Sequence, residues 1–411
     1  MRASWRKVPT ESCHVKAVTE RLLCGDGAPP RSGGAKPRRQ TRPRKCRSSK
    51  CTAKWTTCAS LWLLLSAHLL GQGLAAKAPI TTANDAASFA NPLLPSGADP
   101  WVTMKDGYYY YMHTTGKNLG LWKTRDVTDL KRAPHKVIWT PPNNSPYSRD
   151  IWAPEIHFLE GKWYVYFAAD AGTNRTHRIW VIENPSPDPF AGHWTLKGKV
   201  SDATDRWAID PSVFEDRGRL YMIWSGWEAD KDGLQSIYLA RMKNPWTIES
   251  PRVRISTPEY PWEKIGDLHR KNPALDPVHV DVNEGPEILR HDGDIFLVYS
   301  ASGCWTDAYA LGELVARDDS NLLDPAAWRK FPQPVFQQLP AAGVYAPGHN
   351  SFFVSPDGKE NWILYHANSK PGQGCGEQRS PRAQSFTWNS DGRPNFGKPV
   401  AAGELLARPS H

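Results

Sequence analysis

The strongest constraint on the fold is a pattern that recurs five times between residues 98 and 368 of this 411-residue chain. Each copy opens on a special residue, usually beside a proline, runs through a short apolar stretch to a turn glycine, and closes on an aromatic stretch. A turn glycine between two such stretches predicts a β-hairpin. The five copies are ADPWVTMKDGYYYYMHT, WAPEIHFLEGKWYVYFAAD, IDPSVFEDRGRLYMIWSG, EGPEILRHDGDIFLVYSAS and GHNSFFVSPDGKENWILYHAN.

The special residues, which we call the head residues, lie 54, 57, 74 and 65 residues apart. That spacing accommodates a sheet of about four strands per copy, and no long helical periodicity interrupts the pattern. The sequence therefore predicts an all-β fold, a five-bladed β-propeller over residues 79–411. The inner strands of a propeller line a central channel, so the head residues are expected to converge at one of its mouths. They are Asp99, Ala153, Asp210, Glu284 and His349, and a turn glycine follows each by eight or nine positions, at Gly107, Gly161, Gly218, Gly293 and Gly358.

The basic charge of the chain is confined to its first residues. The formal net charge is +9, but residues 1–76 alone hold 15 Lys and Arg against 3 Asp and Glu. The remainder is near neutral, which removes the main support for nucleic-acid binding. Residues 1–49 are rich in Arg, Pro and Gly and are interpreted as a non-globular leader or a misassigned start.

An export signal is predicted at residues 50–78. Lys50 and Lys54 precede the apolar run CASLWLLLSAHLL, and small residues suited to cleavage follow near Ala75–Ala78. This order is typical of a secretory signal, and the run is too short to span a bilayer comfortably. The protein is therefore expected to be secreted or periplasmic, with no membrane association after cleavage.

The body of the chain contains two cysteines, Cys304 and Cys375, whereas five others lie within the first 58 residues. Two body cysteines in an exported protein are compatible with one disulfide. They are equally compatible with two free, buried thiols, so the residues alone leave both alternatives open.

Three of the head residues are carboxylic acids, Asp99, Asp210 and Glu284. A single Asp at the start of a strand is usually a turn former. Three acids converging on one mouth instead indicate glycosidic cleavage, which needs one protonated carboxyl group and one ionised carboxylate. A third acid can raise the pKa of the proton donor and hold it in place. The pattern alone does not assign these roles.

Aromatic residues and a histidine near the heads are candidates for ligand contacts. Trp101, Trp152 and Trp207 lie within three residues of a head and could stack on sugar rings. Propeller sheets also pack aromatic residues against each other, so a structural role is the alternative for all three. His349 could bind a metal ion or water in the channel, or could be a buried structural histidine.

Two arginines, Arg379 and Arg382, lie where the last sheet should close the ring. Either could donate hydrogen bonds to a sugar hydroxyl. For Arg379 this interpretation and a solvent-exposed side chain are weighted equally, whereas Arg382 is expected to be exposed.

Taken together and in order, the motifs GADPWV, WAPEIH, AIDPSVF, NEGPEIL and PGHNSFF resemble glycoside hydrolase family 43. The resemblance covers about residues 90–408. Two further stretches, SASGCWTDAYALGEL and YHANSKPGQGCGEQRSPRAQSFTW, are similar to the exo-acting α-L-arabinofuranosidase branch of that family. The family implies a five-bladed β-propeller and an inverting hydrolase that releases terminal α-L-arabinofuranose from arabinan or arabinoxylan.

The resemblance also implies roles for individual residues. Asp99 matches the general base, Glu284 the general acid, and Asp210 the acid that tunes the pKa of the proton donor and orients it. Inversion needs a water between base and acid, which corresponds to a carboxyl separation of about 6.5–9.5 Å. Arg379 matches a sugar-binding arginine by its spacing to Gln384.

Three structural predictions follow from the same comparison. His349 matches a histidine that helps to hold a central calcium, often through water, although the chemistry itself is expected to need no cofactor. Cys304 and Cys375 lie in the two branch-like stretches and are predicted to form a disulfide near the pocket. Glu287 lies three residues after Glu284 and is expected to face the other side of the sheet.

Several alternatives stay open at this level. Within the family they are a β-xylosidase, a β-galactofuranosidase or an endo-arabinanase, because the loops that shape the pocket cannot be interpreted from one sequence. A non-catalytic sugar-binding propeller is disfavoured by the three acids, and a structural propeller is favoured least. Five-bladed fructosidases are discounted because GADPWV lacks the flanking Asn residues of their nucleophile motif. The expected partner is a plant cell-wall polysaccharide or oligosaccharide, bound by a monomer without an appended carbohydrate-binding module.

Overall fold

The structure is a computed structural model that describes residues 87–268 and 277–411. Within these ranges the regular structure is almost entirely β-strand, because the repeats supply the β-branched and aromatic side chains that pack on a pleated surface. The expected all-β class is therefore confirmed. The predicted leader (1–49) and export signal (50–78) lie outside the described residues. The short 3₁₀ turns are Val127–Asp129, Asn174–Thr176, Pro261–Glu263, Pro325–Ala327 and Pro340–Ala342.

Each of the five copies forms the start of an antiparallel sheet whose strands follow one another in chain order. The predicted turn glycine stands between the first two strands of every sheet, with φ between 71° and 78°, a conformation that favours glycine. The sheets are β2 (Ala98–Lys105), β3 (Tyr108–Thr114), β4 (Leu119–Thr124) and β5 (His135–Trp139); β6 (Arg149–Leu159), β7 (Lys162–Asp170), β8 (Arg178–Asn184) and β9 (Thr195–Val200); β10 (Ala208–Asp216), β11 (Arg219–Gly226) and β12 (Leu234–Asn244), with β13 (Thr247–Ile248) and β14 (Val253–Ser256) both paired to β12; β15 (Asp281–His291), β16 (Asp294–Ala301), β17 (Ala310–Arg317) and β18 (Arg329–Lys330); and β19 (Tyr345–Val354), β20 (Asn361–Asn368), β21 (Ser380–Trp388) and β22 (Pro394–Asn395).

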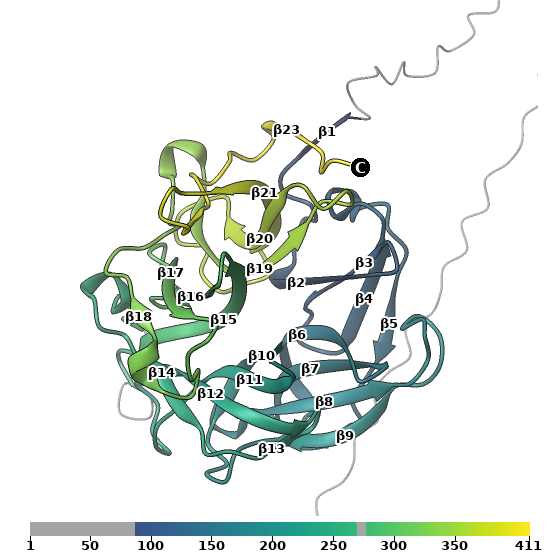
Figure 1. The fold of residues 1–411 in the computed structure, drawn as a ribbon, viewed down its shortest axis with the longest axis vertical. Coiled ribbons are helices and arrows are strands. Elements are labelled where there is room, and N and C mark those ends of the chain that lie inside the picture. Colours follow the sequence, from purple (N-terminus) through teal and green to yellow (C-terminus); the bar gives the residue numbers. More distant parts are fainter. Residues whose placement is uncertain (1–86, 269–276) are drawn as a thin grey trace, which may run out of the picture. The chain divides into compact units, whose positions relative to one another are not determined.

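The first strands of the five sheets lie next to one another around a common centre (Figure 1). β2 contacts β6, β6 contacts β10, β10 contacts β15, β15 contacts β19, and β19 contacts β2. A short parallel pairing of β12 with β15 joins the third and fourth sheets, and β1 (Ser88–Ala90) pairs with β23 (Leu405–Ala407). The strands that carry the head residues are thus mutual neighbours.

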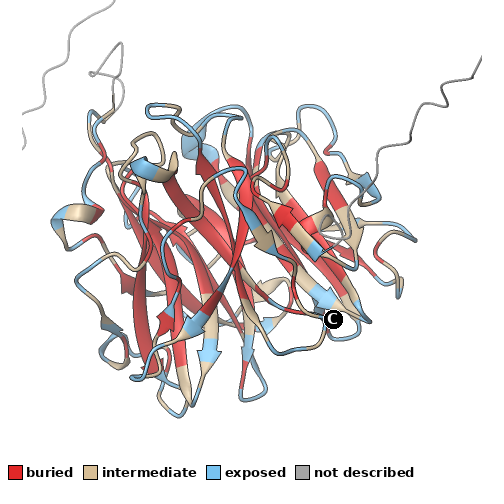
Figure 2. Cartoon of the chain, turned by 90° about the horizontal axis from the view of Figure 1, so that it is seen from above, coloured by how far each residue is buried: buried red, intermediate tan, exposed pale blue. Residues whose placement is uncertain are grey.

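Apolar and aromatic side chains fill the space between neighbouring sheets. One cluster joins the second and third sheets through Tyr166, Trp224 and Tyr238, and another joins the first and fifth through Tyr109 and Trp362. Figure 2 shows this distribution, with buried residues along the strands and exposed residues in the connecting loops. Most tryptophans serve this packing, as the structural interpretation of the aromatic residues expects.

All five first strands contain a β-bulge at the same place. At this place a residue of the first strand adopts a positive φ, and the first strand has one residue more than the second between two successive pairs. β6 and β19 contain a further bulge nearer their start, with positive φ at Asp150 and Ala346. Such a conformation costs non-glycine residues about 1–3 kcal/mol each and is concentrated at functional sites. The bulge residues are Asp99 (φ 55°), Ala153 (43°), Asp210 (53°), Gly285 (54°) and His349 (47°).

The bulge corrects two predictions about the fourth repeat. The position equivalent to Asp99 and Asp210 is Gly285, so Glu284 precedes the bulge by one residue. Glu284 and Glu287 pair with residues only two apart on β16, Ser300 and Val298, because the bulge absorbs the extra residue. The two glutamates therefore lie on the same face of the sheet, and the expectation that Glu287 faces the other side is wrong.

Candidate active site

Asp99 is a buried carboxylate surrounded by hydrogen-bond donors. Its Oδ1 accepts a hydrogen bond from Nη1 of Arg379 (3.0 Å), and its Oδ2 accepts one from the hydroxyl of Thr114 (2.6 Å). Burial alone would raise the pKa of Asp99, but Arg379, followed by His349 and His366, outweighs burial and holds that pKa well below its ordinary value. Asp99 is therefore ionised in the folded protein.

Glu284 is equally buried, but its pKa is shifted in the opposite direction to that of Asp99. Burial raises the pKa of Glu284 to about 7, and the nearby Asp99 carboxylate adds to this effect. Two groups oppose the rise, the Tyr309 hydroxyl, which donates to Glu284 Oε1 at 2.8 Å, and the Arg379 cation. Glu284 therefore holds a proton up to neutral pH while Asp99 does not.

Asp210 connects to the backbone beside Glu284. Its Oδ2 accepts a hydrogen bond from the N–H of Gly285 at 3.0 Å. Burial, then the charges of Glu284 and Asp99, raise the pKa of Asp210 well above its ordinary value. Asp99 thus lies close enough to affect the pKa of Glu284, and both affect the pKa of Asp210, so the structure brings the three predicted carboxyl groups together.

The bulges also tie neighbouring sheets together at this mouth. A bulge turns the backbone N–H sideways, so it can reach a side chain of the adjacent sheet instead of its own ladder. These hydrogen bonds run from Asp99 to His366 Nδ1 (3.1 Å), from Ala153 to Thr114 Oγ1 (2.7 Å), from Gly285 to Asp210 Oδ2 (3.0 Å), and from His349 to Ser300 Oγ (2.7 Å). These hydrogen bonds therefore join four of the five pairs of neighbouring sheets.

His349 lies beside Asp99, with its Nδ1 3.3 Å from Asp99 Oδ1 and its ring against Gly285. Burial lowers the pKa of His349. Calcium takes about six to eight oxygen ligands, and the described residues contain no group of three or more His, Cys, Asp or Glu side chains that could hold a metal ion. These side chains alone do not fit a calcium cage, and a water-mediated calcium at His349 stays a prediction.

The two candidate arginines have different surroundings. Arg379 precedes β21 and is mostly buried, with its guanidinium on Asp99. Arg382 is fully buried on β21, opposite Tyr365, and donates from Nη2 to Ser369 Oγ at 2.8 Å. The expectation that Arg382 is exposed is wrong, because Tyr365 and the loop that begins at Ser369 enclose it.

Trp152 and Trp207 belong to one aromatic cluster beside the second and third bulges. Trp207 is buried, donates from Nε1 to the carbonyl of Asn174 (2.9 Å), and stacks on another tryptophan, Trp227. Trp152 is half-buried and stacks on His177, with ring centres 4.1 Å apart. Trp152 therefore has exposed ring surface that a ligand could contact, whereas Trp207 is buried within the aromatic cluster.

A second pair of acids, Glu155 and Glu287, lies one step further along the first strands. Both are buried, and each lies close enough to affect the pKa of the other. His157 Nε2 lies 2.9 Å from Glu155 Oε2, and the Ser212 hydroxyl donates to Glu287 Oε2 at 3.4 Å. We call the positions where pairing resumes after each bulge the second layer; they are Trp101, Glu155, Ser212, Glu287 and Ser351.

Comparison with known proteins places this site in a family. The model for glycosyl hydrolases family 43 matches residues 89–394. The chain belongs to glycosyl hydrolase family 43. An extracellular exo-α-(1→5)-L-arabinofuranosidase of Streptomyces avermitilis is 39% identical over 84% of this chain and 70% of its own length. A protein of the same name from Streptomyces chartreusis is 39% identical over 74% of this chain and 91% of its own length.

Solved structures agree with this assignment. The crystal structure of an α-L-arabinofuranosidase from Lactobacillus brevis is 36% identical, with a TM-score of 0.70, and the match covers 77% of this chain and 98% of that one. This family 43 protein is thus a glycosidase that hydrolyses O-glycosyl bonds. In the part of the chain that the structure describes, no helix is long and apolar enough to cross a membrane.

Three residues of this family 43 site, Thr114, Tyr309 and His366, were not predicted from the sequence. Thr114 and His366 lie at the end of the second strand in their sheets, across from the position just before the bulge. A signal was present, because four repeats carry a polar residue at that position. These residues are Thr114, Ser225, Ser300 and His366, and the second repeat has Ala168.

The two body cysteines form a disulfide in the structure, with Cα atoms 5.3 Å apart. Cys304 lies between β16 and β17, and Cys375 lies between β20 and β21. Tyr309 ends the first of these connections and Arg379 ends the second. The disulfide therefore joins two loops that both reach the carboxyl groups.

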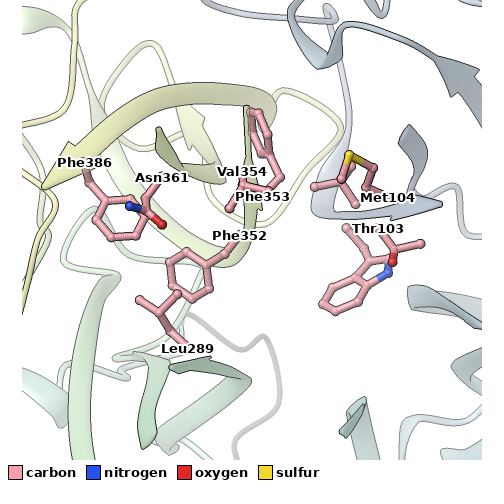
Figure 3. Close-up of a pocket in the computed structure, with 10 residues that line it drawn as sticks. Thr103, Met104, Leu289, Phe352, Phe353, Val354, Asn361 and Phe386 are labelled. Atoms are coloured by element: carbon pink, nitrogen blue, oxygen red, sulfur yellow. The ribbon is translucent and has the colours of Figure 1, made fainter. Parts of the chain in front are cut away.

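Trp101 lies away from the three carboxyl groups of the family 43 site, in the second layer. Its Nε1 donates to the carbonyl of Ile156 (3.0 Å), and its ring packs on His157. It also borders an apolar pocket of about 330 Å³, shown in Figure 3, where Phe352 and Leu289 lie beside each other. None of the three carboxyl groups lines this pocket, so the predicted contact of Trp101 with sugar has no support from its position.

Proposed function

We propose that this protein is an exo-acting α-L-arabinofuranosidase that inverts the configuration at the cleaved carbon. The observation that carries the proposal is the opposite protonation of two carboxyl groups at one mouth, Asp99 ionised and Glu284 protonated. The Streptomyces relatives and the Lactobacillus brevis structure are named for arabinofuranosidase activity, which supports the choice of sugar. Their names do not favour the β-xylosidase, β-galactofuranosidase or endo-arabinanase alternatives.

In this proposal Asp99 is the general base. It accepts a proton from water as the water oxygen attacks the anomeric carbon. Arg379 and Thr114 keep the carboxylate ionised and fix its direction through the hydrogen bonds to Oδ1 and Oδ2. The charge on Asp99 also disfavours ionisation of Glu284, so the base helps the acid to hold its proton.

Glu284 is the general acid of the proposed reaction. As the glycosidic bond breaks, its proton passes to the leaving oxygen, which departs as a neutral hydroxyl. A pKa of about 7 suits this step, because the group is protonated at working pH and still acidic enough to donate. The Tyr309 hydroxyl then stabilises the carboxylate that remains.

Asp210 acts as the orienting acid. Its hydrogen bond to the Gly285 N–H holds the peptide directly after Glu284, which fixes the base of the glutamate side chain. Asp210 itself favours the protonated form, so the charge that raises the pKa of Glu284 comes from Asp99. The half-buried ring of Trp152 is the proposed contact for the apolar face of a sugar.

The proposed architecture is a five-bladed β-propeller of residues 79–411. The cycle of contacts among β2, β6, β10, β15 and β19 supports it, because the first strands of propeller blades surround a channel. Pairing of β1 with β23 brings strands from near the two ends of the described body together. The carboxyl groups then lie at one mouth of that channel.

The proposed setting is outside the cell, with plant cell-wall arabinan or arabinoxylan as the substrate and the protein acting as a monomer. The predicted export signal supports secretion, as do the relatives named extracellular. The disulfide supports it as well, because such bonds persist in oxidising compartments.

The test is a product analysis with linear α-1,5-arabino-oligosaccharides and the purified protein. We expect free arabinose released one unit at a time, and no release by the Glu284→Ala variant. Short oligomers appearing before arabinose would contradict exo action and indicate an endo-arabinanase. No release at all would overturn the choice of sugar, and xylosyl and galactofuranosyl substrates would then be compared.

A further inference from the structure

Two loops at the mouth of the channel meet through the disulfide. Residues 302–309 connect β16 to β17, and residues 369–379 connect β20 to β21. Cys304 and Cys375 are 71 residues apart in the chain, and the bond between them links neighbouring sheets. Each loop ends on a residue that hydrogen-bonds a catalytic candidate, so the disulfide lies close in the chain to both contacts.

The first loop is held by packing as well as by the disulfide. Its last residue, Tyr309, is buried, and its ring is parallel to that of His366. Gly348 lies so close that a Cβ there would be 2.3 Å from the Tyr309 ring. The hydroxyl of Tyr309 therefore keeps its place on Glu284 through side-chain packing.

The second loop has much weaker support near its functional end. It contains three glycines, and two of them, Gly372 and Gly374, have positive φ, so its backbone has many alternative conformations. Before Cys375, Gly372 N–H donates to Asp307 and Asn368 Nδ2 donates to the carbonyl of Gly374. After it, Gln378 accepts a hydrogen bond from Gln373, and the Gly97 N–H donates to the carbonyl of Arg379 at 3.0 Å.

After Cys375 the loop is exposed until Arg379. Gly376, Glu377 and Gln378 are all exposed. The guanidinium of Arg379 contacts Gly376 of the same loop and Asp99 across the mouth. The disulfide is therefore the covalent anchor nearest to the Arg379–Asp99 contact, four residues before the arginine.

We propose that the Cys304–Cys375 disulfide is a positioning element that holds the Arg379 guanidinium on Asp99. The disulfide limits the conformations of the glycine-rich loop, so the arginine stays within hydrogen-bond distance of the carboxylate. Without it, the loop keeps its hydrogen bonds, but the exposed residues 376–378 gain conformational freedom and the contact between the Arg379 side chain and Asp99 becomes intermittent. Tyr309 and Glu284 are affected less, because packing fixes them. The inference rests on the proposed role of Asp99 as the general base.

The test compares four full-length proteins: wild type, Cys304→Ala/Cys375→Ala, Arg379→Met, and the triple variant. The readout is kcat/KM against pH on whichever aryl glycoside the wild type cleaves, so a wrong choice of sugar does not affect it. We expect the cysteine variant to lose about tenfold in kcat/KM and its acid limb to move up by about one pH unit, since an opposite charge shifts a carboxyl pKa by that order. In the Arg379→Met background, cysteine removal is expected to change kcat/KM less than twofold.

Equal losses from cysteine removal in both backgrounds would overturn the proposal, because the disulfide would then act without Arg379. A lower kcat/KM with an unmoved acid limb would also overturn it and indicate a general structural role. Circular dichroism and thermal unfolding check that each variant is folded during the assay.

Reduction provides a second route if the cysteine variant does not fold. A dithiol converts the disulfide into two thiols by two-electron reduction and closes to its own disulfide. We expect it to shift the acid limb of the wild type as the substitutions do, and to leave a folded cysteine variant unchanged. An acid limb that does not move after complete reduction, verified by alkylation of both thiols, would contradict the proposal.

Discussion

The bulge region and the second layer each contain a pair of buried carboxyl groups, but the pKa shifts within the two pairs differ. Asp99 and Glu284 in the bulge region are as buried as Glu155 and Glu287 in the second layer. In the bulge region each acid has its own partner, Arg379 for Asp99 and the Tyr309 hydroxyl for Glu284. In the second layer the partners are the His157 ring for Glu155 and the Ser212 hydroxyl for Glu287.

The difference teaches that the partner, and not burial, assigns the role of each acid. Burial, then Glu287, raises the pKa of Glu155 well above its ordinary value, and burial raises the pKa of Glu287 to about 8. Both acids favour the protonated form, so they do not separate into donor and acceptor of protons. Asp99 and Glu284 shift in opposite directions, which is the arrangement that acid–base catalysis needs.

The largest expected effect is that of Asp99→Asn. An amide cannot accept the proton of the attacking water, so kcat/KM is expected to fall by about 10⁴-fold. The loss should be the same for natural oligosaccharides and for nitrophenyl arabinofuranoside, because both need the base. Steady-state kinetics on the two substrates measure this, and a loss below tenfold on either would remove Asp99 from the role of base.

Glu284→Gln comes next and separates the acid from the base. On arabino-oligosaccharides we expect a loss of about 10³-fold, because the leaving alkoxide needs a proton. On nitrophenyl arabinofuranoside the loss is expected to be far smaller, because nitrophenolate leaves without protonation. Parallel assays with Asp99→Asn provide the control, and equal losses on both substrates would contradict the assignment of Glu284 as the acid.

Tyr309→Phe is expected to have a moderate effect with a defined sign. The hydroxyl stabilises ionised Glu284, so its loss raises the pKa of Glu284 above about 7. The acid then stays protonated to higher pH, and the basic limb of the kcat/KM profile moves upward. A basic limb that stays in place or moves down would show that Tyr309 does not act on Glu284.

Much of this comparison was predictable from the sequence, and the exceptions have physical causes. The hairpins and their turn glycines follow from local sequence patterns, a turn glycine between two apolar or aromatic stretches. The bulge is a feature of the backbone that depends on contacts between sheets. The sequence therefore did not predict that the bulge position of the fourth repeat is Gly285 and not Glu284. The glycine spacing was only a partial trace: the turn glycine follows Asp99, Asp210 and Gly285 by eight residues and Glu284 by nine, but it also follows the bulge residue His349 by nine.

The predicted site was incomplete for a related reason. Asp99, Asp210 and Glu284 could be selected because each opens a repeat. Tyr309 does not open a repeat. Its hydroxyl reaches Glu284 because the residue lies at the end of the loop that connects β16 to β17. The burial of Arg382 likewise depends on packing against Tyr365 and the loop from Ser369, which one sequence does not specify.

Glu287→Gln is expected to have the smallest effect on catalysis and a visible effect on stability. Folded Glu287 binds a proton that the unfolded chain releases above its ordinary pKa of 4.5, so this residue costs the wild type stability as pH rises from about 4.5 to about 8. Glutamine does not titrate, so the variant is expected to gain in thermal stability relative to wild type between pH 5 and pH 8, with kcat/KM within about threefold.

Melting curves of both proteins at pH 5, 6.5 and 8 measure this relation. A difference in melting temperature that is independent of pH would contradict the raised pKa of Glu287 in the folded protein. A loss of activity comparable to that of Glu284→Gln would contradict the division between the two layers.

The most direct test of the central claim is the configuration of the first product. Proton NMR during the first minutes of hydrolysis of an α-L-arabinofuranoside distinguishes the two anomers of free arabinofuranose before they equilibrate. If Asp99 activates water on the face opposite to the bond that Glu284 protonates, the β-anomer appears first. If the α-anomer appears first, the reaction retains configuration, and the assignment of Asp99 as a base acting through water is wrong.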